Sequence, residues 1–129
     1  MEPKLNGVQK ISSHDLIQFY QKILEDSKAE NVTTISLLGK FEEADFMMIA
    51  SGNSVRHVSS ISNRLIEQSK REFKLRGRTE GIENSDWVLL DFGDVIVHIF
   101  RKEVREFYSL EKIWDDTGIN SLRTEISKK

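Results

Sequence analysis

The chain has 129 residues, with seven Gly, one Pro and no Cys; 38% of its residues are hydrophobic and 31% are charged. This length supports one hydrophobic core, and the composition excludes disordered, collagen-like and disulfide-stabilised proteins. A formal net charge of -2 gives no bulk attraction for nucleic acid. The lack of cysteine excludes thiolate metal sites and cysteine nucleophiles, and it favours a reducing, cytoplasmic location.

The two ends of the chain differ from its middle. Residues 1–11 are predicted to be a flexible N-terminus and residues 115–129 a loosely ordered tail, because both are polar and lack a sustained apolar pattern. The longest apolar runs have four or five residues, which is too short for a signal peptide or a membrane span. We therefore expect one domain over residues 12–114 and no membrane partner.

The first half of the domain alternates between helical and strand patterns. Ser12 or Ser13 can cap a helix over 13–27, in which the apolar residues Leu16, Tyr20, Ile23 and Leu24 recur at helical spacing on one side. Runs of β-branched and apolar residues predict strands at 32–38 and 46–50. A Gly-Asn-Ser turn at 52–54 then opens a second helix, which continues to about residue 73.

The second half contains a tight hairpin. A short strand near 75–79 precedes strands at 87–92 and 95–100, which only Gly93 and Asp94 separate, so this hairpin is expected to be the most buried part of the chain. A last helix is predicted over 103–114. The order of elements indicates an α/β fold, a mixed sheet of about five strands covered by helices.

The histidines His14, His57 and His98 have no spacing that converges on one metal ion. Alternation along 95–100 places His98 on the same side of its strand as Ile96 and Phe100. A lone His there is more often a packing residue than a ligand or a base. We predict a structural role for His98, with a protein contact as the main alternative.

Two further motifs have both a chemical and a structural interpretation. Asp91 and Asp94 flank the hairpin turn and could bind Mg²⁺ or act in acid/base catalysis. For Asp94 we favour a structural role in the turn, because an Asp side chain there accepts hydrogen bonds from nearby backbone amides. The 52–54 turn could present amides to a phosphate, with Arg56 nearby, but it lacks the P-loop spacing and Lys. A helix cap is the favoured interpretation.

Charged and aromatic side chains are unevenly distributed. Six basic residues lie from Arg64 to Arg78, which is typical of a solvated helix face and leaves an RNA contact as a secondary alternative. Most of the aromatic residues near the hairpin should be core. Trp87 and Tyr108 are expected to reach the surface along one edge, where aromatic residues serve as interface anchors, and Phe92 at the hairpin's end is expected to face a partner.

The hairpin and last helix contain a long ordered block, Trp87-Val-Leu-Leu-Asp91-Phe-Gly93-Asp94-Val-Ile-Val97-His98-Ile-Phe100, then Arg105, then Tyr108-Ser-Leu110-Glu111-Lys-Ile113-Trp114. Upstream of it lie Glu80-Gly81 and the run Asp45-Phe-Met-Met-Ile-Ala-Ser-Gly52-Asn-Ser54-Val-Arg56-His57-Val58. With these motifs the chain resembles the ribosome silencing factor family, also called Iojap-like, over residues 12–114.

The resemblance implies a mixed α/β domain similar to the nucleotidyltransferase fold, a homodimer, and no cofactor. It further implies binding to ribosomal protein 14 of the large subunit, which blocks joining of the small subunit and represses translation. The family roles, carried over, assign the ribosomal-protein contact to Trp87, Asp91, Phe92, Asp94, His98, Arg105, Tyr108 and Glu111.

The alternative is a Mg²⁺-dependent nucleotidyltransferase-like enzyme. Its site would use Ser54, Asp91 and Asp94, with Arg56 on phosphate. Such enzymes need an Asp-x-Asp or Asp-x-Glu pair on the strand after the Gly-Ser turn, and none follows here. The sequence therefore favours a binding module that lacks catalytic activity and a resident metal.

Overall fold

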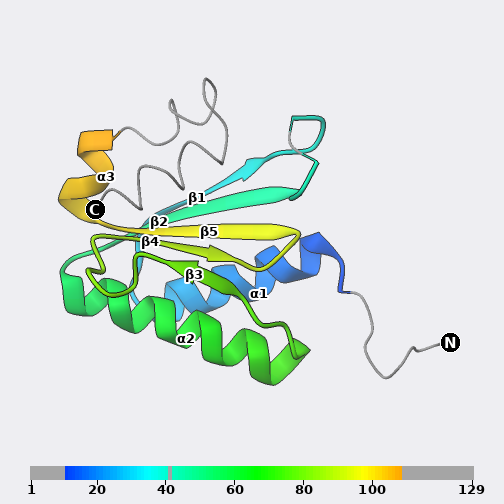
Figure 1. The fold of residues 1–129 in the computed structure, drawn as a ribbon, viewed down its shortest axis with the longest axis horizontal. Helices are drawn as coiled ribbons and strands as arrows, with labels where there is room; N and C mark the ends of the chain where they lie inside the picture. The colour runs from blue at the N-terminus through cyan, green and yellow to red at the C-terminus, as the bar shows by residue number, and fades with distance from the viewer. Residues whose placement is uncertain (1–10, 41, 109–129) are drawn as a thin grey trace, which may run out of the picture.

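The structure is a computed structural model that describes residues 11–40 and 42–108. The described residues form helices and strands in the order α1 (Ser13–Asp26), β1 (Glu30–Ser36), β2 (Phe46–Gly52), α2 (Val55–Phe73), β3 (Arg78–Glu80), β4 (Trp87–Asp91), β5 (Val95–Arg101) and α3 (Lys102–Tyr108). The expected α/β class with a five-stranded mixed sheet is confirmed (Figure 1).

The sheet has the strand order β1-β2-β5-β4-β3. Strands β2 and β5 run parallel, with Phe46 opposite Val95 and Gly52 opposite Arg101, and the other neighbouring strands are antiparallel. Strand β5 is central, and its residues Val95 to Phe100 are all buried. The β4–β5 hairpin lies in the core as expected, but it is not the most buried part of the described chain, because all seven residues of β2 are buried.

The two faces of the sheet carry different apolar clusters. Helices α1 and α2 lie side by side on one face, where they cover alternate residues such as Val97 and Ile99 (Figure 1). The other face carries Ile96 and Phe100, and α3 packs there through Val104. Period-two alternation in the strands therefore supplies both clusters.

Both long helices begin at the serines that the sequence indicated. The backbone N–H of Asp15 donates to Ser12 Oγ at 3.1 Å, and that of His57 donates to Ser54 Oγ at 3.0 Å. Lys74 ends α2 in a left-handed conformation with φ of 55°. None of the helices within 11–40 and 42–108 is long and apolar enough to cross a membrane.

Most predicted boundaries agree with the structure within a few residues. The short third strand lies at Arg78–Glu80, later than 75–79, because residues 75–77 connect the end of α2 to the strand that pairs with β4. The predicted last helix is α3 as far as Tyr108, and its continuation to 114 lies outside the described residues. The predicted flexible ends also lie outside them, apart from Ile11, which is partly buried against the core.

Candidate functional site

Trp87 and His98 form a buried pair across β4 and β5. The indole Nε1 donates to His98 Nδ1 at 2.9 Å, and the indole stacks on Phe100 with ring centroids 4.6 Å apart. Both side chains are at most 1% exposed. The packing role predicted for His98 is confirmed, whereas the expectation that an edge of Trp87 reaches the surface is wrong, because stacking and the hydrogen bond hold the ring inside the fold.

Asp91 and Asp94 stabilise the hairpin turn in different ways. Asp91 Oδ1 accepts from the Gly93 amide at 2.9 Å, and Asp91 Oδ2 pairs with Arg78 Nη2 at 3.0 Å. The carbonyl of Asp94 accepts from the amides of Asp45 and Phe46. The turn role expected of the Asp94 side chain belongs to Asp91, while the Asp94 backbone fixes the start of β2.

Phe92 lies inside the fold although it belongs to the turn. It is 2% exposed, and its ring stacks on Tyr20 of α1 with centroids 4.7 Å apart. A Cβ on Gly77 would lie 2.7 Å from the Phe92 ring, so Gly77 leaves the space that the ring needs. The expectation that Phe92 faces a partner is wrong, because α1 and the segment after α2 enclose the ring.

Arg105 ties α3 to the other edge of the sheet. Its Nη1 donates to the Asn31 carbonyl at 2.7 Å and to Ser51 Oγ at 3.0 Å, and its Nη2 donates to Thr33 Oγ1 at 3.2 Å. Asn31 has a φ of 52° and lies in the bulge of β1. Arg105 therefore holds an irregular strand start in place, a role that its sequence position alone does not indicate.

The predicted contact residues divide between two ends of β5. Asp91, Phe92 and Asp94 lie at its start, whereas Arg105 and the α3 position of Tyr108 follow its end, about 20 Å away at 3.3 Å per strand residue. The Tyr108 side chain and the whole of Glu111 lie outside the described residues. The structure thus brings together Trp87 with His98, but it does not gather the six assigned side chains that it describes into one cluster.

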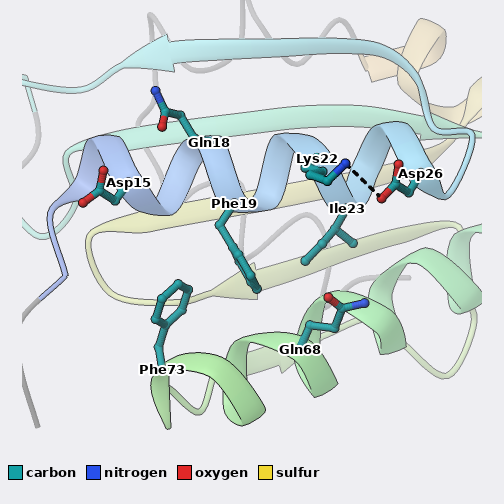
Figure 2. Close-up of a pocket in the computed structure, with 8 residues that line it drawn as sticks. All are labelled: Asp15, Gln18, Phe19, Lys22, Ile23, Asp26, Gln68 and Phe73. Carbon is teal, nitrogen blue, oxygen red and sulfur yellow. Dashed lines mark ion pairs between the residues drawn. The ribbon is translucent and has the colours of Figure 1, made fainter.

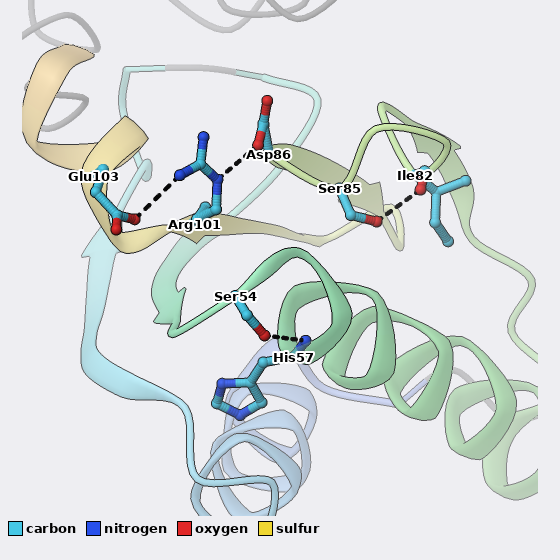
Figure 3. Close-up of polar contacts among 7 residues, drawn as sticks. All are labelled: Ser54, His57, Ile82, Ser85, Asp86, Arg101 and Glu103. Carbon is cyan, nitrogen blue, oxygen red and sulfur yellow. Dashed lines mark hydrogen bonds and ion pairs between the residues drawn. The ribbon is translucent and has the colours of Figure 1, made fainter.

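The Gly-Asn-Ser turn is occupied by contacts within the chain. His57 Nδ1 accepts from the Asn53 amide at 3.0 Å, which leaves Nε2 to donate to the Ser27 carbonyl at 2.7 Å. The Ser54 cap on the His57 amide is visible in Figure 3. A Cβ on Gly52 would lie 2.8 Å from Val58 Cγ2, so Gly52 permits close approach of strand and helix. The helix-cap interpretation is confirmed.

The residues assigned to a nucleotidyltransferase site do not assemble. Ser54 follows Gly52, which is paired with Arg101 at the end of β5, whereas Asp94 precedes Val95 at its start. Ser54 and Asp94 are therefore at opposite ends of the parallel strand pair, about 20 Å apart. Within the part of the chain that the structure describes, no group of three or more His, Asp or Glu is placed to hold a metal ion.

An ion pair that the sequence analysis missed closes the other end of the hairpin. Arg101 Nε bonds Asp86 Oδ1 at 2.7 Å, and Arg101 Nη1 lies 3.4 Å from Glu103 Oε1 (Figure 3). The hydrogen bond and the charge of Asp86 raise the pKa of Arg101. The sequence does contain an indication of this ion pair, because Asp86 directly precedes β4 and Arg101 ends β5, and these two strands are antiparallel neighbours.

Comparisons with known proteins identify the family. The model described as "Ribosomal silencing factor during starvation" (RsfS) matches residues 10–129, so the chain belongs to the ribosomal silencing factor family. The chain is 43% identical over 99 residues to Ribosomal silencing factor RsfS of Zymomonas mobilis, covering 77% of this chain and 74% of that protein. It is 38% identical over 117 residues to the Halalkalibacterium halodurans RsfS, covering 91% of this chain and 100% of that one. The predicted family is confirmed.

Solved structures give the same result for the fold. A crystal structure from Chromobacterium violaceum superposes with a TM-score of 0.77 and 27% identity over 81% of this chain and 88% of that one. One from Bacillus halodurans has a TM-score of 0.71 and 38% identity, covering 79% and 95%. The chain is also 30% identical over 102 residues to a mouse protein named "Mitochondrial assembly of ribosomal large subunit protein 1", covering 76% of this chain and 44% of that protein.

Proposed function

We propose that this chain represses translation by binding ribosomal protein 14 of the large subunit and sterically blocking association with the small subunit. Membership of the ribosomal silencing factor family carries the proposal. The name of the mouse relative, which refers to the large ribosomal subunit, supports the choice of subunit. Occlusion by a docked domain requires no reaction, so we propose a cytoplasmic, non-enzymatic protein without a cofactor, and a homodimer when it is free of the ribosome.

The partner contact is proposed to extend from the hairpin turn to α3. Asp94 at the turn, Glu103 on α3 and Glu111 further along supply negative charge suited to a basic ribosomal protein. Asp91, whose side chain is 11% exposed and pairs with Arg78, is proposed to keep the turn in shape beneath this contact. A standard interface of about 800 Å² per partner is about 30 Å across, so one interface can include both ends of β5. Tyr108 is proposed as the apolar anchor.

The other assigned residues are proposed to support this contact indirectly, by stabilising the elements that carry it. Trp87, Phe92 and His98 are buried, so they keep the hairpin in shape rather than provide contact area. Arg105, through its bonds to β1 and β2, sets the position of α3. Substitution of these four should weaken ribosome binding together with stability.

A secondary ribosomal RNA contact is proposed at the end of α2. Lys70, Arg71, Lys74 and Arg76 are exposed there. Contacts between such side chains and phosphates weaken steeply with salt. Replacing all four of these basic residues by Gln should reduce the salt dependence of ribosome binding and leave subunit selectivity unchanged.

Co-sedimentation with purified large and small subunits tests the main proposal. The chain should pellet with large subunits only, and subsequent addition of small subunits should yield fewer joined ribosomes. Glu103→Lys should weaken pelleting about tenfold, whereas Glu83→Lys, on the exposed β3–β4 connection, should not. Pelleting equally with both subunits, or normal joining in its presence, would contradict the proposal. Magnesium-dependent nucleotide turnover would contradict the non-enzymatic part.

A further inference from the structure

A groove of about 440 Å³ lies on the outer side of the helical layer, between α1 and α2 (Figure 2). Helices α1 and α2 lie on the face of the sheet opposite to the one on which α3 packs. The groove therefore lies on a different surface from the α3 contact proposed above.

The floor of the groove is apolar. Phe19 of α1 and Phe73 of α2 meet edge to face with ring centroids 4.7 Å apart, and Ile23 lies one turn beyond Phe19. Both rings are only partly buried, so each keeps an accessible edge. The outer side of a surface helix usually carries polar side chains. An aromatic pair at this position can therefore pack against an apolar side chain of a binding partner.

The α1 wall of the groove is acidic at both ends. Asp15 and Asp26 both line it, eleven residues apart, which is about 16 Å along a helix. Lys22 is the cation in the lining, and it lies 3.8 Å from Asp26 with its side chain 78% exposed. Such an exposed pair is weak and exchanges readily for a partner's cation. Gln68 and Phe73, on the α2 wall, are uncharged, so the lining has two carboxylates against one ammonium.

We propose that this groove docks a basic amphipathic helix of another protein. Such a helix would place apolar side chains on Phe19 and Phe73 and two basic side chains, about eleven positions apart, at Asp15 and Asp26. A helix laid between two helices with apolar anchors at helical spacing is an established mode of peptide recognition. The carboxylates disfavour a phosphate inside the groove itself, and none of the basic side chains proposed above for an RNA contact belongs to its lining.

The test uses a defined probe and the full chain. The probe is an alanine-based helical peptide with two Lys eleven positions apart and Leu and Trp between them on the same stripe. Titration into ¹⁵N-labelled protein should shift the amides of α1 and of Phe73 in a saturable way. The same peptide with Glu in place of Lys should not produce these shifts.

Three variants distinguish specific docking from nonspecific adsorption of the peptide. Asp15→Asn with Asp26→Asn should lower the affinity about fivefold, whereas Glu42→Gln with Glu83→Gln, an equal charge change at exposed positions outside the groove lining, should leave it unchanged. Gln68→Trp, which fills the groove without altering charge, should abolish binding while circular dichroism shows a folded chain.

Equal binding of the Glu peptide, equal weakening by the control pair, or shifts located outside α1 and α2 would overturn the proposal. The assay contains no ribosome, so its outcome is independent of the function proposed above.

Discussion

Trp87 and His98 are joined by a 2.9 Å hydrogen bond between Nε1 and Nδ1, across two antiparallel strands in the core. Because the indole nitrogen only donates, Nδ1 of His98 must accept, and the imidazole is held as the tautomer with its proton on Nε2. A buried hydrogen bond at this position favours a single packing arrangement of the apolar side chains around it, because other arrangements would leave a polar atom without its partner.

Trp87→Phe should lower the free energy of unfolding by about 1–3 kcal/mol, because it removes the donor to a buried acceptor while retaining most of the aromatic volume. Urea denaturation followed by circular dichroism measures this change. The double variant with His98→Leu should lose less than the sum of the two single variants, since both polar partners are then absent. Strict additivity would show that the bond contributes nothing.

Phe92→Ala should cost about 3–5 kcal/mol of stability, because it empties the site between Tyr20 and Gly77. Thermal unfolding is the measurement. Leu38→Ala, at a side chain that is 58% exposed, serves as the matched control and should change stability by less than about 0.5 kcal/mol. A fully stable Phe92→Ala chain that loses only ribosome binding would restore Phe92 as a direct contact.

Gly52→Ala should destabilise the chain by about 1–3 kcal/mol, because the new methyl group would lie 2.8 Å from Val58 Cγ2 and 3.1 Å from the Val58 amide nitrogen. Adding Val58→Ala should relieve part of this strain, because it removes the methyl group that the new Cβ would meet. In chemical denaturation, the double variant should therefore lose less stability than the sum of the losses of the two single variants. An unchanged melting temperature for the single variant would mean that β2 and α2 are not in close contact at Gly52 and Val58.

Burial raises the pKa of Tyr20 to about 12 from its ordinary value of 10, although the Ser69 hydrogen bond acts in the opposite direction. The unfolded chain therefore releases this proton first as pH rises. The contribution of the protonated Tyr20 to the free energy of unfolding is fully present below pH 10 and is lost as the pH rises from about 10 to about 12. The loss is on the order of 2–3 kcal/mol.

The Tyr20→Phe variant should be less stable at neutral pH, since Ser69 loses its partner, but its stability should fall less between pH 10 and pH 12. Denaturation curves for both chains over that range provide the comparison. Parallel pH profiles would assign the alkaline loss to other groups.

The sequence by itself determined the order and type of the elements and the direction of many side chains. Helical spacing of Leu16, Tyr20 and Leu24 predicted the buried side of α1, and alternation placed His98 with Ile96 and Phe100. These properties depend on the periods of 3.6 and 2 and on capping residues, all of which operate over a few neighbouring positions.

Only the tertiary structure decided which candidate contact residues remain at the surface. Phe92 is buried because Tyr20, distant in the chain, stacks on it, and Arg105 is engaged because the bulge at Asn31 turns a carbonyl toward it. The groove beside Phe19 exists because α2 brings Phe73 alongside α1. Such outcomes depend on contacts between distant segments, and local periodicity does not specify how packed elements enclose a particular side chain.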